Sequence, residues 1–383
     1  MIRHLAILIV VLATTAATAM SQQNLWHDDA TLSPVVHDDG RVTLRLYAPM
    51  AESVMAVGDF AADGVYMERR DDGMWETTLG PLPSELYSYS FTVDGVTNVC
   101  DPSNAYAMRD VGRQMSYFIV AGERGDLYRA QAVAHGTVSR MWMTTDEGSR
   151  RMTIYTPAGY EDGDSCYPTL YLLHGMGGDE ESWLATGRVA EIMDNLIAQG
   201  AAEPMIVVMP NGCMQHASAP GYSHEGMWRP YMSGSMDGSF ERHLAAVVAW
   251  TDEHFRTLAC KTSRAVAGLS MGGFHALHAS HAYPALFDYV GLFSAAIFRG
   301  AEGVALYEDM PAGLAALFRQ GVRLYWVGIG RDDFLYEENM TFRAMLDAAG
   351  YEYVYYESDG GHTWRNWRVY LTEFAKLLFV VNE

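Results

Sequence analysis

The chain has 383 residues, which is enough for two domains, and its 49% apolar and 19% charged residues are typical of a globular protein with a sizeable core. Its 26 Lys and Arg residues against 47 Asp and Glu residues give a formal net charge of -21. Such an acidic surface repels nucleic-acid phosphates and anionic lipid headgroups, so we expect a neutral or weakly charged substrate and no nucleic-acid partner.

The N-terminus has the pattern of a signal peptide over residues 1–21. A basic start precedes an apolar run over Leu5–Leu12, and small residues follow, with cleavage expected after Ala19 or Ser21. The apolar run is too short to span a bilayer, so no stable membrane insertion is expected after cleavage. We therefore expect an exported protein, located in a periplasm or outside the cell.

Residues 24–122 are expected to form a small immunoglobulin-like β-sandwich. Apolar and polar residues alternate with a period of two in Val42–Tyr47 and in Tyr87–Asp94, which is the pattern of half-buried strands. Turn signals lie between such strands in the form of Asp-Gly pairs, at residues 39–40, 72–73 and 94–95. Short strands separated by tight turns are typical of a β-sandwich.

Residues 127–383 change to apolar runs that alternate with helical patterns. Strands are expected at residues 167–173, 205–209, 264–269, 289–294, 324–329 and 353–356. Helices are expected at residues 185–199, 240–256, 271–282 and 338–349. Continuous apolar strands with helices between them predict an α/β fold, a mostly parallel sheet with helices on both faces. The long connection at 212–238 is a candidate substrate-facing loop.

Four cysteines, Cys100, Cys166, Cys213 and Cys260, would meet an oxidising compartment after export. An even number permits disulfides without requiring them in a chain of this size. Their spacing is not that of a zinc site, and we expect no metal and no cofactor. Cys166 and Cys260 each precede an expected core strand, so a bridge between them is possible if their Cα atoms lie within about 7 Å.

Ser270 lies in the run Gly268-Leu269-Ser270-Met271-Gly272, which has the G-x-S-x-G pattern of a nucleophile elbow. In such an elbow the chain turns sharply from a strand into a helix, and the serine has a strained backbone. Gly268 and Gly272 leave the space that this turn needs. The expected strand before Ser270 and helix after it provide the required context, so we expect an α/β-hydrolase domain with Ser270 as its nucleophile.

A serine hydroxyl needs an adjacent base, and in this fold the acid and then the histidine follow the serine along the chain. Asp332 and Asp333 come just after an expected strand, on the edge of the sheet that carries the elbow. Asp333 is the candidate acid and Asp332 the alternative. His362 follows the last expected strand and two glycines, and is the candidate base.

The run His174–Gly178 ends another expected strand in a glycine-rich loop. The backbone N–H groups of Met176 in this loop and of Met271 after the nucleophile are candidate oxyanion-hole donors. No Gly-Lys-Ser/Thr sequence follows the glycines, which disfavours a phosphate-binding loop. Together these residues predict ester hydrolysis through an acyl-enzyme on Ser270, with His362 as general base and then general acid.

The part of the chain from 127 to 383 resembles carbohydrate esterase family 1, the feruloyl and acetyl-xylan esterases among the putative esterases. The motifs that carry this resemblance are Leu172–Gly178 with Glu181 and Trp183, Gly268–Gly273, Asp333–Leu335, and Gly360–Trp364 with Trp367. The N-terminal part resembles carbohydrate-binding module family 48, an early-set immunoglobulin-like domain, in Val42–Pro49, Gly58–Phe60 and Tyr87–Gly95. The resemblance also implies a triad of Ser270, Asp333 and His362.

The resemblance implies a serine carboxylesterase that acts on esterified plant polysaccharide, with feruloyl esters of arabinoxylan as the first choice. Acetyl-xylan, an enterobactin-type siderophore trilactone, and acyl transfer to a sugar are the alternatives. An aromatic acyl group needs a flat apolar slot, and Trp183, Trp228 and Trp364 are candidate walls, although each could equally be a core residue. The aromatic residues of the N-terminal part alternate as core residues do, which favours a structural role for it.

Overall fold

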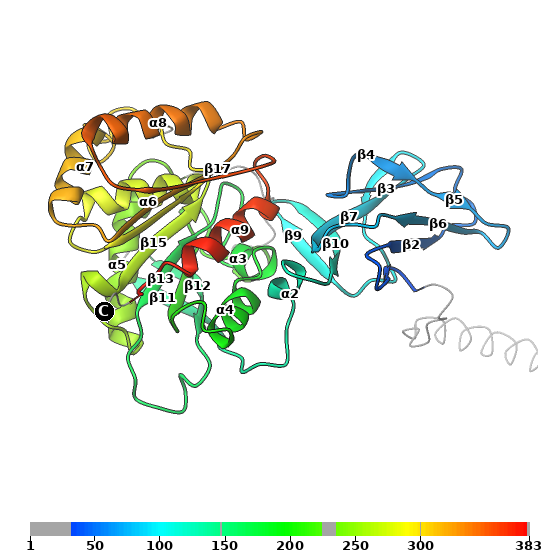
Figure 1. Ribbon diagram of the computed structural model, residues 1–383, viewed down its shortest axis with the longest axis horizontal. Coiled ribbons are helices and arrows are strands. Elements are labelled where there is room, and N and C mark those ends of the chain that lie inside the picture. Colours follow the sequence, from blue (N-terminus) through cyan, green and yellow to red (C-terminus); the bar gives the residue numbers. More distant parts are fainter. Residues whose placement is uncertain (1–31, 146–147, 224–234, 299, 381–383) are drawn as a thin grey trace, which may run out of the picture.

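The computed structural model describes residues 32–145, 148–223, 235–298 and 300–380. In this part the chain forms a β-sandwich and an α/β domain that lie side by side along the long axis of the molecule (Figure 1). The predicted fold class is confirmed. The predicted signal peptide and Trp228 lie outside the described residues. Within the described ranges, no helix has the length and apolar character needed to cross a membrane.

The N-terminal domain is built from two antiparallel sheets. One has the strand order β1-β2-β6-β5, formed by β1 (Val35–Val36), β2 (Val42–Tyr47), β6 (Met74–Leu79) and β5 (Glu68–Arg69). The other has the order β4-β3-β7-β10-β9, with β8 beside β7; its strands are β3 (Val54–Gly58), β4 (Ala61–Tyr66), β7 (Glu85–Val93), β8 (Val96–Val99), β9 (Ala107–Asp110) and β10 (Arg113–Val120). Alternate residues of both sheets, such as Leu44, Phe91 and Phe118, meet in one core.

The α/β domain has one eight-stranded sheet in the order β11-β12-β14-β13-β15-β16-β17-β18. Its strands are β11 (Thr137–Thr145), β12 (Gly148–Thr156), β13 (Thr169–Leu173), β14 (Ile206–Pro210), β15 (Arg264–Leu269), β16 (Tyr289–Phe293), β17 (Leu324–Gly330) and β18 (Val354–Ser358). The six neighbouring strands β14, β13, β15, β16, β17 and β18 run parallel, and β11 and β12 add an antiparallel edge. This edge was absent from the sequence-based prediction, because β11 is mostly exposed or half-buried and lacks the long apolar run of the buried parallel strands.

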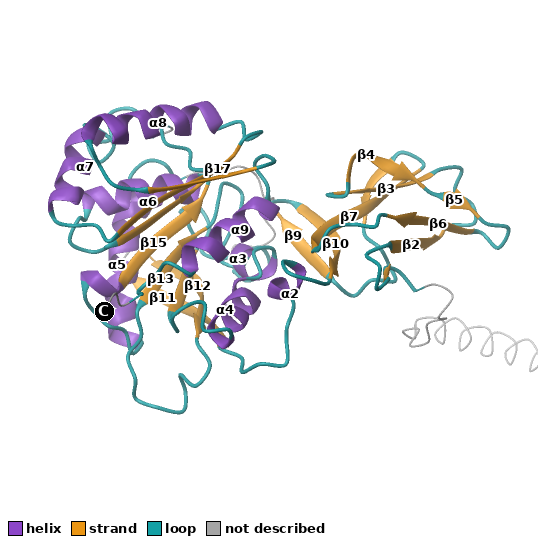
Figure 2. Cartoon of the chain, viewed as in Figure 1, coloured by secondary structure: helices purple, strands orange, loops and turns teal. Residues whose placement is uncertain are grey.

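Helices cover both faces of this sheet (Figure 2). The helices are α2 (Gly125–Tyr128), α3 (Ser182–Ala185), α4 (Val189–Ala198), α5 (Ser239–His254), α6 (Met271–Ala282), α7 (Met310–Arg319), α8 (Tyr336–Ala349) and α9 (Trp364–Ala375), with a short 3-10 helix at Lys261–Ser263. Of these, α2 lies between the sandwich and α4. Neighbouring residues of β13 point to opposite faces. Leu170 and Leu172 pack with α4 and α9, whereas Tyr171 and Leu173 pack with α5 to α8. The continuous apolar strands are therefore explained by burial on both sides.

The sandwich is docked against the α9 side of the α/β domain. Leu86 of β7 and Met108 of β9 are buried in the same apolar cluster as residues of α4 and α9. Arg368 of α9 donates from Nη2 to Oε1 of Glu85 at 3.2 Å, and both side chains are almost fully buried. Loss of one partner from such a buried pair leaves an uncompensated charge, so this contact fixes how the two domains meet.

The four cysteines are free thiols in the structure. Cys166 and Cys260 are exposed, and the Cys260 thiol lies 3.2 Å from the Thr262 hydroxyl. The bridge between them that the sequence allowed is therefore not formed.

Candidate active site

Ser270 occupies the sharp turn between β15 and α6. Its backbone has φ 53° and ψ -114°, a conformation that is strained for any residue with a side chain. The turn also requires Gly272, because a Cβ there would lie only 2.4 Å from the carbonyl oxygen of Leu173. The elbow therefore has the geometry that its sequence pattern predicted.

Asp333 and His362 are in direct contact. Nδ1 of His362 lies 2.9 Å and 3.0 Å from the two carboxylate oxygens of Asp333. Asp333 is buried and its Oδ1 also accepts a hydrogen bond from the Leu335 N–H at 2.9 Å, whereas Asp332 is exposed. Of the two neighbouring acids, Asp333 therefore faces the histidine and holds its Nε2 free to act.

The serine lies on the same edge of the sheet as this pair. Ser270, Asp333 and His362 follow the carboxyl ends of β15, β17 and β18, three strands that run parallel. Within the described ranges, the hydrogen bonds among these three side chains are those between Asp333 and His362, and none joins Ser270 Oγ to Nε2 of His362.

The glycine-rich loop after β13 runs beside the nucleophile. The N–H of Gly178 donates to the carbonyl of Gly175 at 3.1 Å, which closes a turn with Met176 and Gly177 at its corner. Gly177 has φ 79°, as the third residue of such a turn requires. A Cβ on Gly175 would lie 3.3 Å from Cβ of Ser270, so this loop and the elbow are in contact.

The two candidate oxyanion donors come from these two elements. Met271 opens α6, and the N–H groups in the first turn of a helix have no partner within the helix. Met176 lies at the corner of the adjacent turn. His174 holds the loop in place, because its Nε2 accepts from the Gly212 N–H at 2.7 Å and its Nδ1 lies 2.8 Å from the Gly175 carbonyl. Burial lowers the pKa of His174, so the ring is neutral with the proton on Nδ1.

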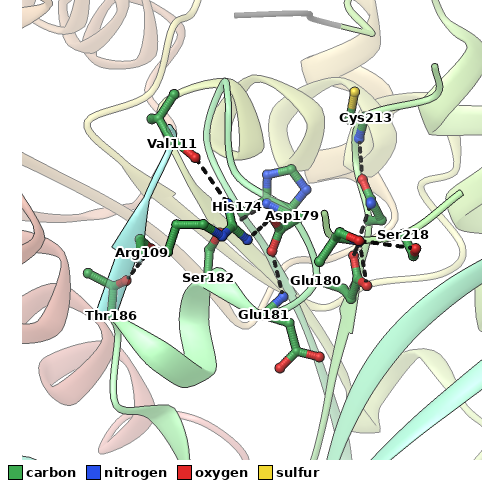
Figure 3. Close-up of polar contacts among 12 residues, drawn as sticks. Arg109, Val111, His174, Asp179, Glu180, Glu181, Ser182, Thr186, Cys213 and Ser218 are labelled. Carbon is green, nitrogen blue, oxygen red and sulfur yellow. Dashed lines mark hydrogen bonds and ion pairs between the residues drawn. The ribbon is translucent and has the colours of Figure 1, made fainter. Parts of the chain in front are cut away.

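Three consecutive acids, Asp179, Glu180 and Glu181, follow the glycine loop (Figure 3), and each binds a different part of the chain. Asp179 pairs with Arg109 of the sandwich. Glu181 binds Arg140 and Arg151 of the antiparallel edge at 2.8 Å and 2.9 Å. Ionic contacts therefore hold the segment after the glycine loop both to the sandwich and to the antiparallel strands β11 and β12.

Glu180, the middle acid, is fully buried, and its partners lie in the segment that begins the long connection after β14. It accepts from the Ala219 N–H at 2.8 Å and 2.9 Å and from Nδ2 of Asn211 at 2.9 Å. Arg151 also donates to it at 3.2 Å. Burial raises the pKa of Glu180 to about 7. The sequence analysis missed this residue, because an acid in a loop usually lies at the surface.

The candidate aromatic walls have different positions. Trp183 is fully buried, its Nε1 donates to the Leu173 carbonyl at 2.9 Å, and its ring meets Phe293 edge-on. Of the two roles that the sequence left open for Trp183, substrate wall or core residue, the structure therefore gives it the core role. Trp364 is half-buried, and its Nε1 donates to Asp110 of the sandwich at 3.0 Å.

An exposed aromatic residue that the sequence analysis did not select lies beside the base. The Phe334 side chain is 73% exposed, and its ring centroid lies 4.6 Å from that of His362. Its position next to Asp333 in the chain is the signal that could have identified it, because the strand end that positions the acid also positions Phe334.

A cavity of about 550 Å³ lies between the two domains, beside the loop that carries His362. Such a volume is typical of small-molecule sites. The sandwich contributes Met108, Asp110 and Met115 to its walls, and the α/β domain contributes His362, Trp364 and Trp367.

The described residues contain no group of three or more His, Cys, Asp or Glu side chains arranged to hold a metal ion. His275 and His278 on α6 are buried among aromatic rings. His275 bonds to Glu241 at 2.8 Å and His278 to His281 at 3.0 Å, so both pack within the fold.

Comparisons with known proteins match both domains. Residues 144–313 match the family model described as putative esterase, and residues 31–106 match carbohydrate-binding module 48, the isoamylase N-terminal domain. The chain is 30% identical over 361 residues to an endo-1,4-beta-xylanase/feruloyl esterase of Xylanibacter ruminicola. This match covers 90% of the chain but 46% of that protein, so the chain spans less than half of this relative.

Solved structures show the same architecture. A ferulic acid esterase with 26% identity has a TM-score of 0.52 and aligns over 64% of this chain and 98% of its own. The enterobactin esterase of Shigella flexneri has 18% identity and a TM-score of 0.63, and aligns over 88% of this chain and 93% of its own, which shows a shared fold. The α/β domain is therefore similar to the putative esterases over residues 144–313, and the N-terminal domain is similar to carbohydrate-binding module 48 over residues 31–106.

Proposed function

We propose that this protein is a serine carboxylesterase in which Ser270 is the nucleophile, His362 the general base and Asp333 the residue that orients it. The observation that carries the proposal is the contact of His362 with the buried Asp333. This contact lies at the carboxyl ends of the parallel strands, where the strained Ser270 meets the glycine loop. This arrangement can take a proton from an alcohol and accept negative charge on a carbonyl oxygen.

The cycle has two halves. His362 Nε2 takes the Ser270 proton while Oγ bonds to the ester carbonyl carbon, and the carbonyl oxygen becomes an oxyanion facing the Met176 and Met271 N–H groups. The C–O bond to the alcohol then breaks, and His362 gives its proton to the leaving alcohol. In the second half, His362 takes a proton from water as the water oxygen bonds to the acyl carbon. The bond between that carbon and Oγ then breaks, which releases the acid, and His362 returns the proton to Oγ of Ser270.

We propose feruloyl esters of plant polysaccharide as the substrate class. The support is the match over 90% of the chain to a protein named as a xylanase and feruloyl esterase, and the 26% identity to a ferulic acid esterase. The ring centroid of Phe334 lies 4.6 Å from that of His362, and Trp364 lines the same cavity as His362, so both offer apolar surface for an aromatic acyl group. Trp228 remains a candidate wall from the sequence.

Acetyl esters are the second candidate, because the chain is also 26% identical over 243 residues to an acetyl esterase of Caldicellulosiruptor saccharolyticus, covering 56% of the chain and 84% of that protein. The net charge of -21 disfavours an anionic iron complex of an enterobactin-type trilactone. Export after removal of residues 1–21 belongs to the same proposal, as does the division into a sandwich at 24–122 and an esterase domain at 127–383. The buried Glu85–Arg368 contact supports a structural role for the sandwich.

The proposal is tested by comparing initial rates on methyl ferulate, acetylated xylan and a catecholate trilactone. Ser270→Ala is expected to lower each rate by at least about a thousandfold, since the acyl-enzyme cannot form. Asp333→Ala is expected to lower kcat strongly, whereas the exposed neighbour Asp332→Ala serves as a matched control with near-normal kcat. Ester hydrolysis that survives in Ser270→Ala would contradict the mechanism, and a marked preference for acetylated xylan would contradict the feruloyl substrate.

A further inference from the structure

We propose that the tip of the β9–β10 hairpin of the sandwich, residues 109–111, positions the oxyanion loop of the esterase domain, with Arg109 as its central positioning residue. The proposal rests on the esterase function proposed above. It gives the N-terminal domain a part in the reaction that does not depend on whether this domain binds a carbohydrate.

The first contact is ionic. The guanidinium of Arg109 pairs with Asp179, the residue that directly follows the Gly175–Gly178 turn and whose side chain is 1% exposed (Figure 3). Arg109 is itself fixed, because its Nη1 donates to the Val111 carbonyl at 3.0 Å and its own carbonyl accepts from the Thr186 hydroxyl at 3.2 Å. A carboxylate buried this deeply depends on its partner, so the position of Asp179 follows that of Arg109.

The second contact is steric. A Cβ on Gly177 would lie 2.9 Å from Cγ1 of Val111, so the Val111 side chain rests directly on the corner of the oxyanion turn. Val111 has φ 52°, which is a strained conformation for a β-branched residue. Strain of this kind persists only where the surroundings hold it, and here the bond from Arg109 to the Val111 carbonyl does so.

The third contact is with the segment that carries His362, the proposed base. Asp110 accepts a hydrogen bond from Nε1 of Trp364 at 3.0 Å, and Trp364 lies two residues after His362 in the chain. The Trp364 ring meets the Trp183 ring edge-on at 5.3 Å, and Trp183 binds the last carbonyl of β13, just before the oxyanion loop. One hairpin tip therefore touches both the loop that would hold the oxyanion and the segment that carries the base.

This arrangement has a kinetic consequence. Oxyanion donors act only when they are held where the charge develops, and a displacement of about 1 Å can lower the rate about a hundredfold. If the hairpin tip sets the place of the loop, its loss lowers the acylation rate of a small soluble ester. If it only joins the two domains, its loss lowers stability and leaves acylation unchanged.

The test uses the full chain and two readouts, kcat and KM on p-nitrophenyl acetate and the rate of Ser270 labelling by a fluorophosphonate. We expect Arg109→Ala to lower kcat and the labelling rate about ten- to a hundredfold, with KM within about twofold. Arg109→Lys keeps the charge and is expected to recover part of the loss. Arg365→Ala is the matched control, because Arg365 makes another interdomain pair, with Glu85 at 3.8 Å, and does not touch the loop.

A second variant separates positioning from folding. Val111→Gly removes the side chain over Gly177 and relieves the positive φ, so we expect an unchanged or higher melting temperature together with slower acylation. Normal kcat and labelling in both Arg109→Ala and Val111→Gly would overturn the positioning role, as would an equal loss in Arg365→Ala. Failure of the wild-type chain to label at Ser270 would instead overturn the proposed esterase function.

Discussion

The substitution Gly272→Ala tests how closely the nucleophile elbow and the oxyanion loop are coupled. A Cβ on Gly272 would lie 2.4 Å from the carbonyl oxygen of Leu173 and 2.6 Å from that of His174. Both are backbone atoms at the end of β13, so no side-chain rotation can relieve the overlap. The strand end and the loop that follows it must move instead.

The size of this movement follows from the same distances. Ordinary van der Waals contact with a Cβ begins at 3.4 Å, so the carbonyl of Leu173 or the start of α6 must shift by about 1 Å. A displacement of about 1 Å in a catalytic group can cost about a hundredfold in rate. Overpacking a tight site also costs about 1–3 kcal/mol of stability. We therefore expect Gly272→Ala to fold and to lose about two orders of magnitude in kcat.

The assay is kcat on a soluble aryl ester, together with urea unfolding. Gly273→Ala is the matched control, because its Cβ would lie 2.6 Å from Cβ of Ala295 and would press on the segment after β16 rather than on the oxyanion loop. Both variants should lose similar stability, but Gly272→Ala should lose far more activity. Activity of Gly272→Ala within about threefold of the wild type, or an equal loss in Gly273→Ala, would refute this reasoning.

Two further predictions concern pH. Burial raises the pKa of Glu180 from 4.5 to about 7, so the stability that this group contributes is present below pH 4.5 and is lost as the pH rises through 7. Glu180→Gln should therefore weaken the decline in unfolding free energy between pH 5 and 8 by about 3 kcal/mol, and identical pH profiles would contradict this. Burial lowers the pKa of His278 from 6.5 to about 3, so wild-type stability should fall as the pH drops from 6.5 toward 3. Urea titrations should show a shallower fall for His278→Gln, and a slope equal to that of the wild type would argue against a buried neutral ring.

Local sequence signals were sufficient for the centre of the α/β domain. The strand at 264–269 and the helix at 271–282 have the predicted bounds, because the apolar run and the glycines around Ser270 permit little else. Chain order selected His362 and limited the acid to Asp332 or Asp333, and the resemblance favoured Asp333, which the structure places in contact with His362. Their roles in catalysis stay predictions. The antiparallel edge formed by β11 and β12 was missed, since β11 is mostly exposed or half-buried at the sheet edge and lacks a long apolar run. The helices α7 and α9 were also missed.

The sequence by itself therefore determined the buried parallel strands, the nucleophile elbow and the order in which the candidate acid and base follow those strands. Only the tertiary structure decided which polar residues would be buried and paired, because that depends on segments far apart in the chain. Asp179 and Arg109 are 70 residues apart, and Glu180 is 39 residues from Ala219. Trp183 could equally have lain in the core or at the surface on sequence grounds, and the packing of α9 and the sandwich placed it inside.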